Sequence, residues 1–369
     1  MKKILLVSPY YKDSYTNHIS MGSAVKISEN LSRKFKVLVL TTGRKIKSER
    51  VNSNLSVESI TGWLIPDPIN YMISPRLLFR FYQELSDFQP DLVMVSKYMF
   101  FSSFVIPIAR LKKIKVVTIT DTFPGINWFS QSRLASLVMW LYARIIGIPL
   151  LRWSDKVVLL YPGLKDIAKK YSLNYVTIPN GVDAQYFRRL PSPSDITKPK
   201  GEFWVGFVGR PESAKGYSIA QQIADRLLDQ KHIKFVFVGD PYASGLVKNR
   251  LYLGFRKDVM EVYGLFDCLI LPSRAEGLPN VVMEAMSQGV PVIASAVGGV
   301  NHLIQSGKNG ILVPPQSIPE FTEAIIGLQS NLRLRSRIGQ NAKQTIKNHF
   351  NWEKILNDYQ ILINNLCAE

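Results

Sequence analysis

The sequence predicts an α/β protein with two doubly wound domains that face each other across a cleft. Its 369 residues suffice for two domains of about 100–200 residues each. Short apolar, β-branched runs recur at helix-length intervals, which is typical of parallel strands buried on both faces and joined by helices. The pattern stops once, in a proline-containing stretch, and then restarts. Such sheets bind ligands at the carboxyl ends of their strands, which predicts a binding site along the cleft.

The first half of the chain carries six candidate strands. They are Ile4–Val7, Lys36–Leu40, Asp91–Ser96, Lys115–Thr120, Asp155–Leu160 and Tyr175–Pro179. The first run follows two lysines, as in a signal peptide, but it ends at Ser8-Pro9 with no small-residue cleavage site. We therefore expect a buried first strand and a cytoplasmic protein.

Residues 188–201 contain three prolines and no apolar periodicity, which indicates a linker. We expect an N-terminal domain over residues 1–190 and a C-terminal domain over residues 191–350. The candidate strands of the second half are Phe203–Val208, Ile233–Val238, Leu251–Gly254, Cys268–Pro272, Pro291–Ser295 and Gly310–Val313. Helical spacing of apolar residues predicts helices at residues 218–230, 319–329 and 331–349 and an amphipathic one at 351–366.

The net charge of +18 is concentrated in the first half of the chain. Residues 1–190 carry 27 basic and 12 acidic side chains, a net +15, whereas residues 191–369 carry 19 and 16, a net +3. This asymmetry suggests a different partner for each half. Two cysteines and four scattered histidines exclude a disulfide scaffold and a cysteine-rich zinc module, and we expect no metal site.

Residues 134–151 form a run of 18 mostly apolar residues, close to the ~20 needed to span a bilayer. Arg144 lies inside the run, and Arg133 and Arg152 flank it. Three interpretations stay open: a helix that lies on a membrane surface, a buried helix of the first domain, and a spanning helix. We favour the first, because arginines and amphipathic aromatic residues suit an interface.

Other basic segments in the first half support contact with a membrane. Residues 76–85 combine arginines with aromatic residues at helical spacing, and residues 44–47 and 112–115 are lysine- and arginine-rich. Each basic group near an anionic leaflet contributes about 1 kcal/mol. We expect this half to bind an anionic membrane surface, although each cluster alone is equally consistent with a solvated face.

A first candidate site lies after the strand that ends at Val208. The chain turns at Gly209, so that Arg210 and Lys215 fall in the loop at the carboxyl end of that strand. Arginine offers a planar fork that suits phosphate oxygens, and lysine offers a mobile point charge. The pair is suited to neutralising a departing diphosphate, although a solvated turn would look the same.

A second candidate site spans residues 272–285. Glu276 lies just before a helix that we expect to begin at Pro279 or Asn280, where free N–H groups attract anions. Glu284 lies one turn inside this helix, whose other residues are mostly apolar. A buried carboxylate needs hydrogen-bond donors, and the hydroxyls of a sugar or a ribose would supply them. The alternatives are a capping carboxylate for Glu276 and an ion pair for Glu284.

Several motifs together resemble the retaining, nucleotide-sugar-dependent glycosyltransferases of family 4. They are Gly209-Arg210, Lys215-Gly216, the Glu276–Glu284 pair, the Gly298-Gly299 turn after a strand, and Asn180-Gly181-Val182-Asp183. The resemblance implies the GT-B fold, with two Rossmann-like domains, the donor in the C-terminal domain, and a final helix (residues 351–369) that packs back on the N-terminal domain. It also implies that neither a metal nor a cofactor is needed.

The resemblance assigns roles to matching positions of the second half. Arg210 and Lys215 would bind the donor diphosphate, Glu276 would hold hydroxyls of the transferred sugar, and Glu284 would bind the ribose. The other expected contacts are Gly209, the backbone of Gly277, Leu278 and Asn280, and Phe255 in the segment near the nucleobase.

The first half matches the family more loosely. The family has a glycine-rich loop after the first strand, and Met21-Gly22-Ser23-Ala24 matches it with the single glycine Gly22. Where the family often has His-Asp, this sequence has Thr120-Asp121. Asp121 is therefore our polar candidate near the reaction centre, with a helix or turn cap as the alternative.

The resemblance predicts a retaining hexosyltransferase that uses a nucleotide-sugar donor. The basic, aromatic first half favours a lipid-linked or membrane-borne acceptor, such as a glycolipid, a polyprenyl diphosphate sugar or a cell-surface polysaccharide. It also favours a peripheral location on the inner face of the plasma membrane. We considered three alternatives. A nucleic-acid binder lacks a recognition motif, and a dehydrogenase lacks a Gly-x-Gly-x-x-Gly after a strand. A sugar-nucleotide epimerase on the same two-domain scaffold stays open.

Overall fold

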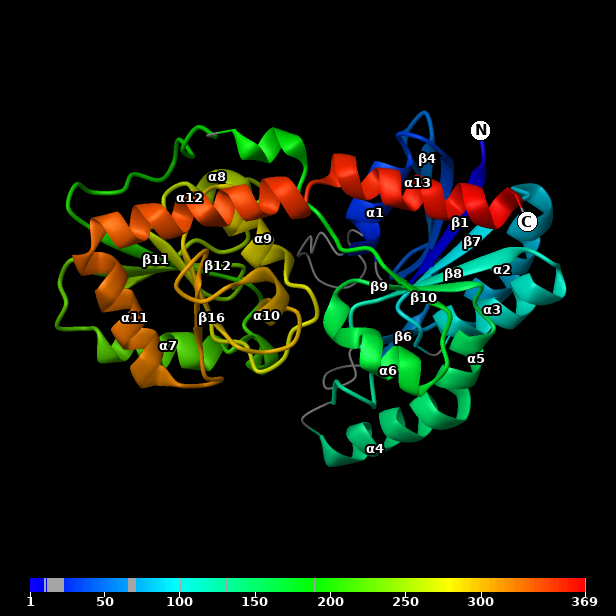
Figure 1. Ribbon diagram of the computed structural model, residues 1–369, viewed down its shortest axis with the longest axis horizontal. Coiled ribbons are helices and arrows are strands. Elements are labelled where there is room, and N and C mark those ends of the chain that lie inside the picture. Colours follow the sequence, from blue (N-terminus) through cyan, green and yellow to red (C-terminus); the bar gives the residue numbers. More distant parts are fainter. Residues whose placement is uncertain are drawn as a thin grey trace. The chain divides into compact units, whose positions relative to one another are not determined.

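The computed structural model describes residues 1–9, 11, 23–65, 71–99, 101–129, 132–188 and 190–368. By their contacts the residues form two units, the first comprising Met1–Asn180 with Ile355–Glu369 and the second Gly181–Lys354. Each unit is built on one mostly parallel sheet covered by helices (Figure 1). The predicted α/β class with two Rossmann-like domains is confirmed.

The first unit has an eight-stranded sheet in the order β10-β9-β8-β7-β1-β2-β4-β3, and only β3 runs antiparallel to its neighbour. Its strands are β1 (Lys3–Ser8), β2 (Lys36–Gly43), β3 (Lys47–Asn52), β4 (Leu55–Thr61), β7 (Leu92–Ser96), β8 (Lys115–Thr120), β9 (Lys156–Leu159) and β10 (Tyr175–Thr177). A separate hairpin pairs β5 (Trp63–Ile65) with β6 (Tyr71–Ile73). The helices are α1 (Ser23–Leu31), α2 (Pro75–Asp87), α3 (Phe101–Leu111), α4 (Arg133–Tyr142), α5 (Ile148–Arg152), α6 (Lys165–Lys170) and α13 (Trp352–Ala368).

Both faces of this sheet are buried, as the apolar runs predict. Leu5 and Val7 of β1 pack with α2 and α3 in one core cluster. Ile4 and Leu6 alternate with them and therefore point to the opposite face, where they are equally inaccessible at 0% exposure. All six predicted strands of this half are present.

Strands β3 and β4 were not predicted, because their residues contain no continuous apolar run. Every side chain of β3 is exposed, and the strand starts at Lys47, the last residue of the basic segment 44–47. Charged residues on an edge strand oppose pairing with other chains. The polar character of β3 therefore fits its position at the end of the sheet.

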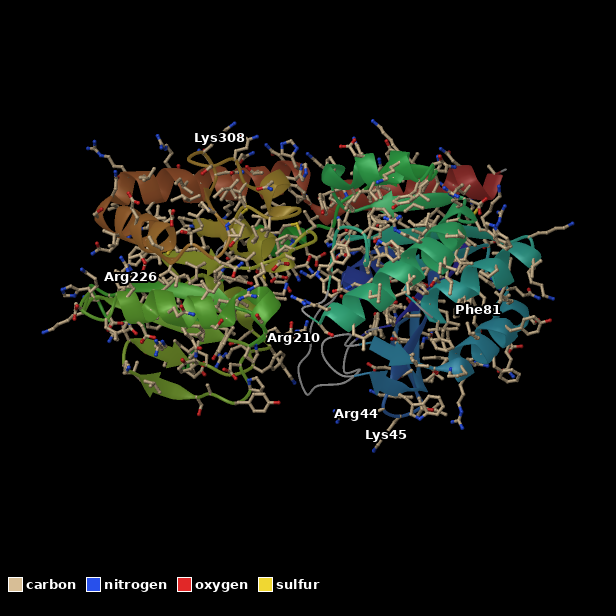
Figure 2. All side chains as sticks on the ribbon, turned by 90° about the horizontal axis from the view of Figure 1, so that it is seen from below. Arg44, Lys45, Phe81, Arg210, Arg226 and Lys308 are labelled. Carbon is tan, nitrogen blue, oxygen red and sulfur yellow. The ribbon has the colours of Figure 1, made fainter. Side chains whose placement is uncertain are left out.

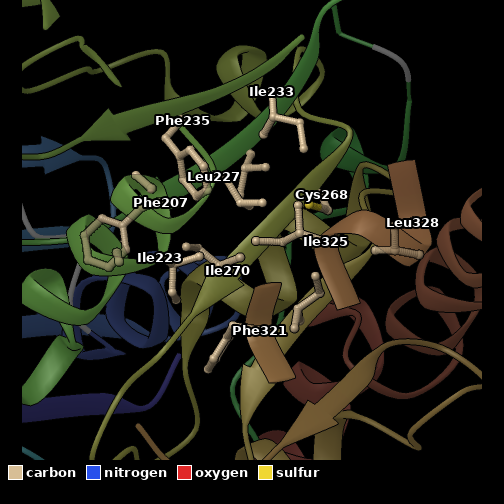
Figure 3. Packing of buried hydrophobic residues seen from close by; sticks show 14 of the residues in the cluster. Phe207, Ile223, Leu227, Ile233, Phe235, Cys268, Ile270, Phe321, Ile325 and Leu328 are labelled. Carbon is tan, nitrogen blue, oxygen red and sulfur yellow. The ribbon is translucent and has the colours of Figure 1, made fainter. Parts of the chain in front are cut away.

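The second unit has a seven-stranded sheet in the order β13-β14-β12-β11-β15-β16-β17, with only β13 antiparallel to its neighbour. Its strands are β11 (Phe203–Val208), β12 (Ile233–Val238), β13 (Gly245–Val247), β14 (Arg250–Tyr252), β15 (Cys268–Leu271), β16 (Val292–Ser295) and β17 (Ile311–Val313). The helices are α7 (Tyr217–Arg226), α8 (Val259–Tyr263), α9 (Asn280–Ser287), α10 (Val300–Leu303), α11 (Ile318–Ser330) and α12 (Leu332–His349). Helices α7 and α11 cover one face, and Figure 3 shows Ile223, Phe321 and Ile325 packed against the strand residues Phe235 and Ile270.

The proline-containing segment of residues 190–201 is fastened to the second unit. Asp195 Oδ1 accepts a hydrogen bond of 2.8 Å from the Arg256 guanidinium. Lys198 Nζ donates to the carbonyl of Leu265 over 3.1 Å. This segment is therefore held in place and does not behave as a free tether. The last helix, α13, belongs to the first unit from Ile355 onward.

Candidate active site

The loops after β11, β12 and β14 meet at the carboxyl edge of the second sheet. Gly209 N donates to the carbonyl of Val238 over 2.9 Å, and Gly239 N donates to the carbonyl of Gly254 over 2.7 Å. Gly239 has a φ of +106°, and a Cβ there would lie 2.7 Å from the carbonyl oxygen of Gly209. Glycine at 239 thus brings the Gly209 loop close to the segment that contains Phe255.

Lys215 and Glu276 meet at this edge, although they are 61 positions apart in sequence. Lys215 Nζ lies 2.9 Å from each carboxylate oxygen of Glu276. Ser273 Oγ donates to Glu276 Oε1 over 2.7 Å. The Glu276 side chain is only 5% exposed, whereas that of Lys215 is 31% exposed. The site therefore presents a partly accessible ammonium group with a buried carboxylate beside it.

Two glycines fix the backbone around this ion pair. Gly216 has a φ of +70°, and a Cβ there would lie 2.0 Å from the carbonyl oxygen of Pro272. Gly298 has a φ of +50°, and a Cβ there would lie 1.8 Å from the carbonyl oxygen of Glu276. Gly299 N donates to the carbonyl of Gly277 over 2.8 Å. Glycines allow a close approach to the backbone, and the close neighbour of the Gly298-Gly299 turn is the Glu276 backbone.

Arg210 lies in the same loop as Lys215 but has its own carboxylate. Its Nη1 is 2.9 Å from Glu212 Oε1, and the two side chains are 43% and 33% exposed. Figure 2 shows Arg210 at the opposite end of the second unit from Arg226, the last residue of α7. Each predicted diphosphate-binding cation is therefore already paired with a glutamate.

Helix α9 begins at Asn280, and Pro279 is its N-cap residue. The Tyr263 hydroxyl donates to Glu284 Oε2 over 3.1 Å. Burial raises the pKa of Tyr263, and the carboxylate of Glu284 adds to this shift. The Leu278 side chain is buried, so this residue offers a ligand only its backbone. Asn280 Oδ1 is buried and has no hydrogen-bond partner among the described residues.

A second buried carboxylate, which we did not predict, lies at this edge. Asp240 follows β12 and is 6% exposed. The hydroxyl of Tyr217 donates to its Oδ2, and Tyr242 N donates to its Oδ1 over 2.9 Å. The position of Gly239-Asp240 directly after a predicted strand could have indicated it, because position after a strand indicated Arg210 and Lys215. Ser273 and Tyr263 were also missed, and the contacts of Tyr263 have no signature in the sequence.

In the first unit, Asp121 directly follows β8 at the carboxyl edge of that sheet. Thr122 Oγ1 donates to its Oδ1 over 3.5 Å. Burial raises the pKa of Tyr161 to about 12, and the Asp121 carboxylate acts in the same direction. Gly22, the predicted residue of the glycine loop, lies outside the described residues, and α1 starts at Ser23.

The apolar run of residues 133–152 folds as α4, a π-helical turn at Ala143–Gly147, and α5. By length and composition alone, this helix could cross a membrane. Of its most apolar 18-residue window, 39% is buried. Its exposed side is also apolar, with Leu134 at 72%, Leu137 at 52% and Ile145 at 68% exposure. The Arg144 guanidinium lies 4.6 Å from the centre of the Trp140 ring. Only one side of this helix therefore packs on the first unit.

No group of three or more histidine, cysteine, aspartate or glutamate side chains suited to a metal ion occurs in the described part of the chain.

Two family models match the chain. The family described as Glycosyltransferase Family 4 matches residues 23–186, and the family described as Glycosyl transferases group 1 matches residues 202–331.

An uncharacterized glycosyltransferase of Methanocaldococcus jannaschii is 27% identical over 331 residues, which are 84% of this chain and 82% of that protein. The UDP-Gal:alpha-D-GlcNAc-diphosphoundecaprenol alpha-1,3-galactosyltransferase of Escherichia coli is 28% identical over 193 residues, 47% of this chain and 50% of that protein. The second match thus spans only half of that enzyme.

Solved structures share the whole fold. Sucrose-phosphate synthase from Thermosynechococcus elongatus has a TM-score of 0.80 at 20% identity, covering 100% of both chains. Anabaena HepE in complex with UDP-glucose has a TM-score of 0.76 at 19% identity, covering 99% of this chain and 100% of that one. At these identities the likeness establishes the fold alone.

The fold and the two family matches define the protein as a glycosyltransferase. The chain belongs to glycosyltransferase family 4 and has the GT-B fold. The comparisons do not support the sugar-nucleotide epimerase that we considered as an alternative.

Proposed function

We propose that this glycosyltransferase moves a hexosyl group from a nucleoside diphosphate sugar to an acceptor hydroxyl, with retention at the anomeric carbon. The observation that carries the proposal is the Lys215–Glu276 pair at the carboxyl edge of the second sheet. A cation beside a buried carboxylate suits a donor that has an anionic diphosphate next to a hydroxyl-rich sugar. The reaction proceeds without a metal or a cofactor.

The residues at the edge divide the chemistry between them. Lys215 and Arg210 neutralise the negative charge that grows on the leaving diphosphate. The carboxylate of Glu276 accepts hydrogen bonds from sugar hydroxyls, and its charge stabilises the positive charge that develops on the sugar. A diphosphate oxygen takes the proton of the acceptor hydroxyl. Glu284 and the segment at Phe255 hold the nucleoside.

A thermal-shift screen of UDP-, GDP- and ADP-sugars tests the donor. HepE binds UDP-glucose and the Escherichia coli relative is named for UDP-Gal, so uridine donors come first. A ligand at 100 times its Kd stabilises the native state by about 2.7 kcal/mol. We expect one nucleotide to raise Tm by several degrees, equally with and without EDTA, and the product to keep the donor's anomeric configuration by NMR. A screen in which no nucleotide sugar raises Tm contradicts the proposal.

We further propose that the acceptor is lipid-linked or membrane-borne and that the enzyme is peripheral on the inner face of the plasma membrane. The exposed apolar side of residues 133–152 and the net charge of +15 over residues 1–190 support an anionic membrane partner. The diphosphoundecaprenol in the name of the Escherichia coli relative supports a polyprenyl acceptor. Asp121 is the polar residue of the first unit that we assign to binding the acceptor.

Replacing both Leu137 and Ile145 with aspartate should weaken binding to anionic vesicles at least tenfold. Each leucine or isoleucine side chain contributes about 1.5–3 kcal/mol when fully buried in an apolar phase, and each aspartate adds repulsion. Co-sedimentation with phosphatidylglycerol vesicles at low and high salt measures the change. Leu246→Asp is the control, because Leu246 is 63% exposed on β13 of the second unit. Absence of wild-type binding at low salt, or equal binding by the double variant, contradicts the membrane proposal.

A further inference from the structure

Both cations that we assign to the donor diphosphate already hold an anion in the structure. The Arg210 guanidinium lies 2.9 Å from Glu212, and the Lys215 ammonium lies 2.9 Å from both oxygens of Glu276. A diphosphate that approaches either cation competes with the carboxylate already there for one positive charge and for some of the same N–H donors. Displacing the carboxylate frees all of these donors for the diphosphate and removes the repulsion between the two anions.

Glu212 is built into the loop that carries both cations. Its N–H donates to the carbonyl of Arg210 over 2.7 Å, and its carbonyl accepts from Lys215 N over 3.1 Å. These bonds use only its backbone and leave the carboxylate free to pair with Arg210. Exposed ion pairs contribute little to protein stability, so the fold does not depend on this contact. The carboxylate matters instead because it competes for the arginine.

Glu276 differs because its carboxylate is buried. When a diphosphate takes the Lys215 ammonium, Glu276 keeps Ser273 as a donor but loses its cation. A buried carboxylate without enough donors is costly, and sugar hydroxyls restore the missing hydrogen bonds. Diphosphate binding at Lys215 thereby prepares Glu276 for the sugar, and the two halves of the donor bind cooperatively.

We propose that Glu212 and Glu276 act as internal counter-anions of Arg210 and Lys215 and that the donor diphosphate displaces both of them. This inference rests on the proposed function, because it assigns the order of events at that site. Glu212 thereby becomes a residue that sets donor affinity, and the exchange at Glu276 favours an intact nucleotide sugar over a bare diphosphate.

Removing the charge of Glu212 should strengthen anion binding. We expect Glu212→Gln to bind inorganic pyrophosphate and UDP about fivefold more tightly than the wild type by calorimetry at low salt, with a smaller gain at high salt. Glu323→Gln is the matched control, because Glu323 is exposed on α11 and its loss changes the net charge equally. That variant should bind like the wild type.

Glu276→Gln provides a second, independent measurement. We expect this variant to bind pyrophosphate more tightly than the wild type, because it lacks the carboxylate that competes for Lys215. Its turnover of the nucleotide sugar should fall, because the same carboxylate accepts hydrogen bonds from the sugar hydroxyls. If either glutamine variant binds pyrophosphate no more tightly than Glu323→Gln, the inference is overturned. If the wild type binds none of pyrophosphate, UDP, GDP and ADP, the proposed function itself fails with it.

Discussion

Lys215→Ala should lower turnover by about 100–1000-fold while the protein still folds. Removal of one preorganised electrostatic donor costs about 2.7–4 kcal/mol of transition-state stabilisation. Lys215 is such a donor, because its backbone is fixed by the neighbouring Gly216, where a Cβ would lie 2.0 Å from the carbonyl oxygen of Pro272. The loss should appear in kcat, since the charge on the diphosphate grows as the sugar departs.

The substitution also removes the cation from a buried carboxylate. We expect the free energy of unfolding to fall by about 1–3 kcal/mol, which denaturant titration measures separately from turnover. Lys308→Ala removes an exposed lysine elsewhere in the second unit (Figure 2) and should change neither quantity. Arg210→Ala should lower turnover in the same direction as Lys215→Ala. Near-normal turnover in both of these variants would falsify the assigned role.

The strands were predictable because a doubly wound sheet leaves a strong mark on the sequence. A central strand such as β1 or β12 is buried on both faces and reads as an unbroken apolar run. Edge strands lack such an apolar run. For this reason β3, whose side chains are all exposed, was not predicted. The helix that starts at Asn280 was predictable from its proline, because proline fits where the first N–H groups have no partner.

The candidate site was predictable only to the level of its loops. Position at the carboxyl end of a strand indicated Arg210 and Lys215, since the topology of a parallel sheet places such loops at one edge. Position just before a helix indicated Glu276, and the family resemblance indicated Asp121. Spacing along the chain does not encode side-chain pairing across loops. The partners of these groups, Glu212 for Arg210 and Ser273 for Glu276, therefore emerged only from the structure.

Gly298→Ala should inactivate the enzyme by displacing Glu276. A Cβ at this position would lie 1.8 Å from the carbonyl oxygen of Glu276, a backbone atom that cannot rotate away. Separation of the two segments breaks the 2.8 Å hydrogen bond from Gly299 N to the carbonyl of Gly277. A displacement of 1 Å in a catalytic group lowers turnover about 100-fold, and we expect at least that loss.

Stability should fall together with turnover. Alanine at the φ of +50° found at Gly298 costs about 1–2 kcal/mol by conformation alone. Overpacking adds about 1–3 kcal/mol, so the free energy of unfolding should fall by roughly 2–5 kcal/mol. Denaturant titration and steady-state kinetics measure the two effects on the same preparation.

Gly307→Ala is the control for Gly298→Ala, because it separates the effect of the close backbone contact from the effect of the backbone conformation. Gly307 has a φ of +77° but no heavy atom within 4 Å of a Cβ built there, so alanine at this position carries only the conformational cost of about 1–2 kcal/mol. Its turnover should stay at the wild-type value. The difference between the two variants therefore measures how strongly Glu276 depends on the turn beneath it. Equal losses of stability and full turnover in both variants would show that Glu276 is held by other contacts.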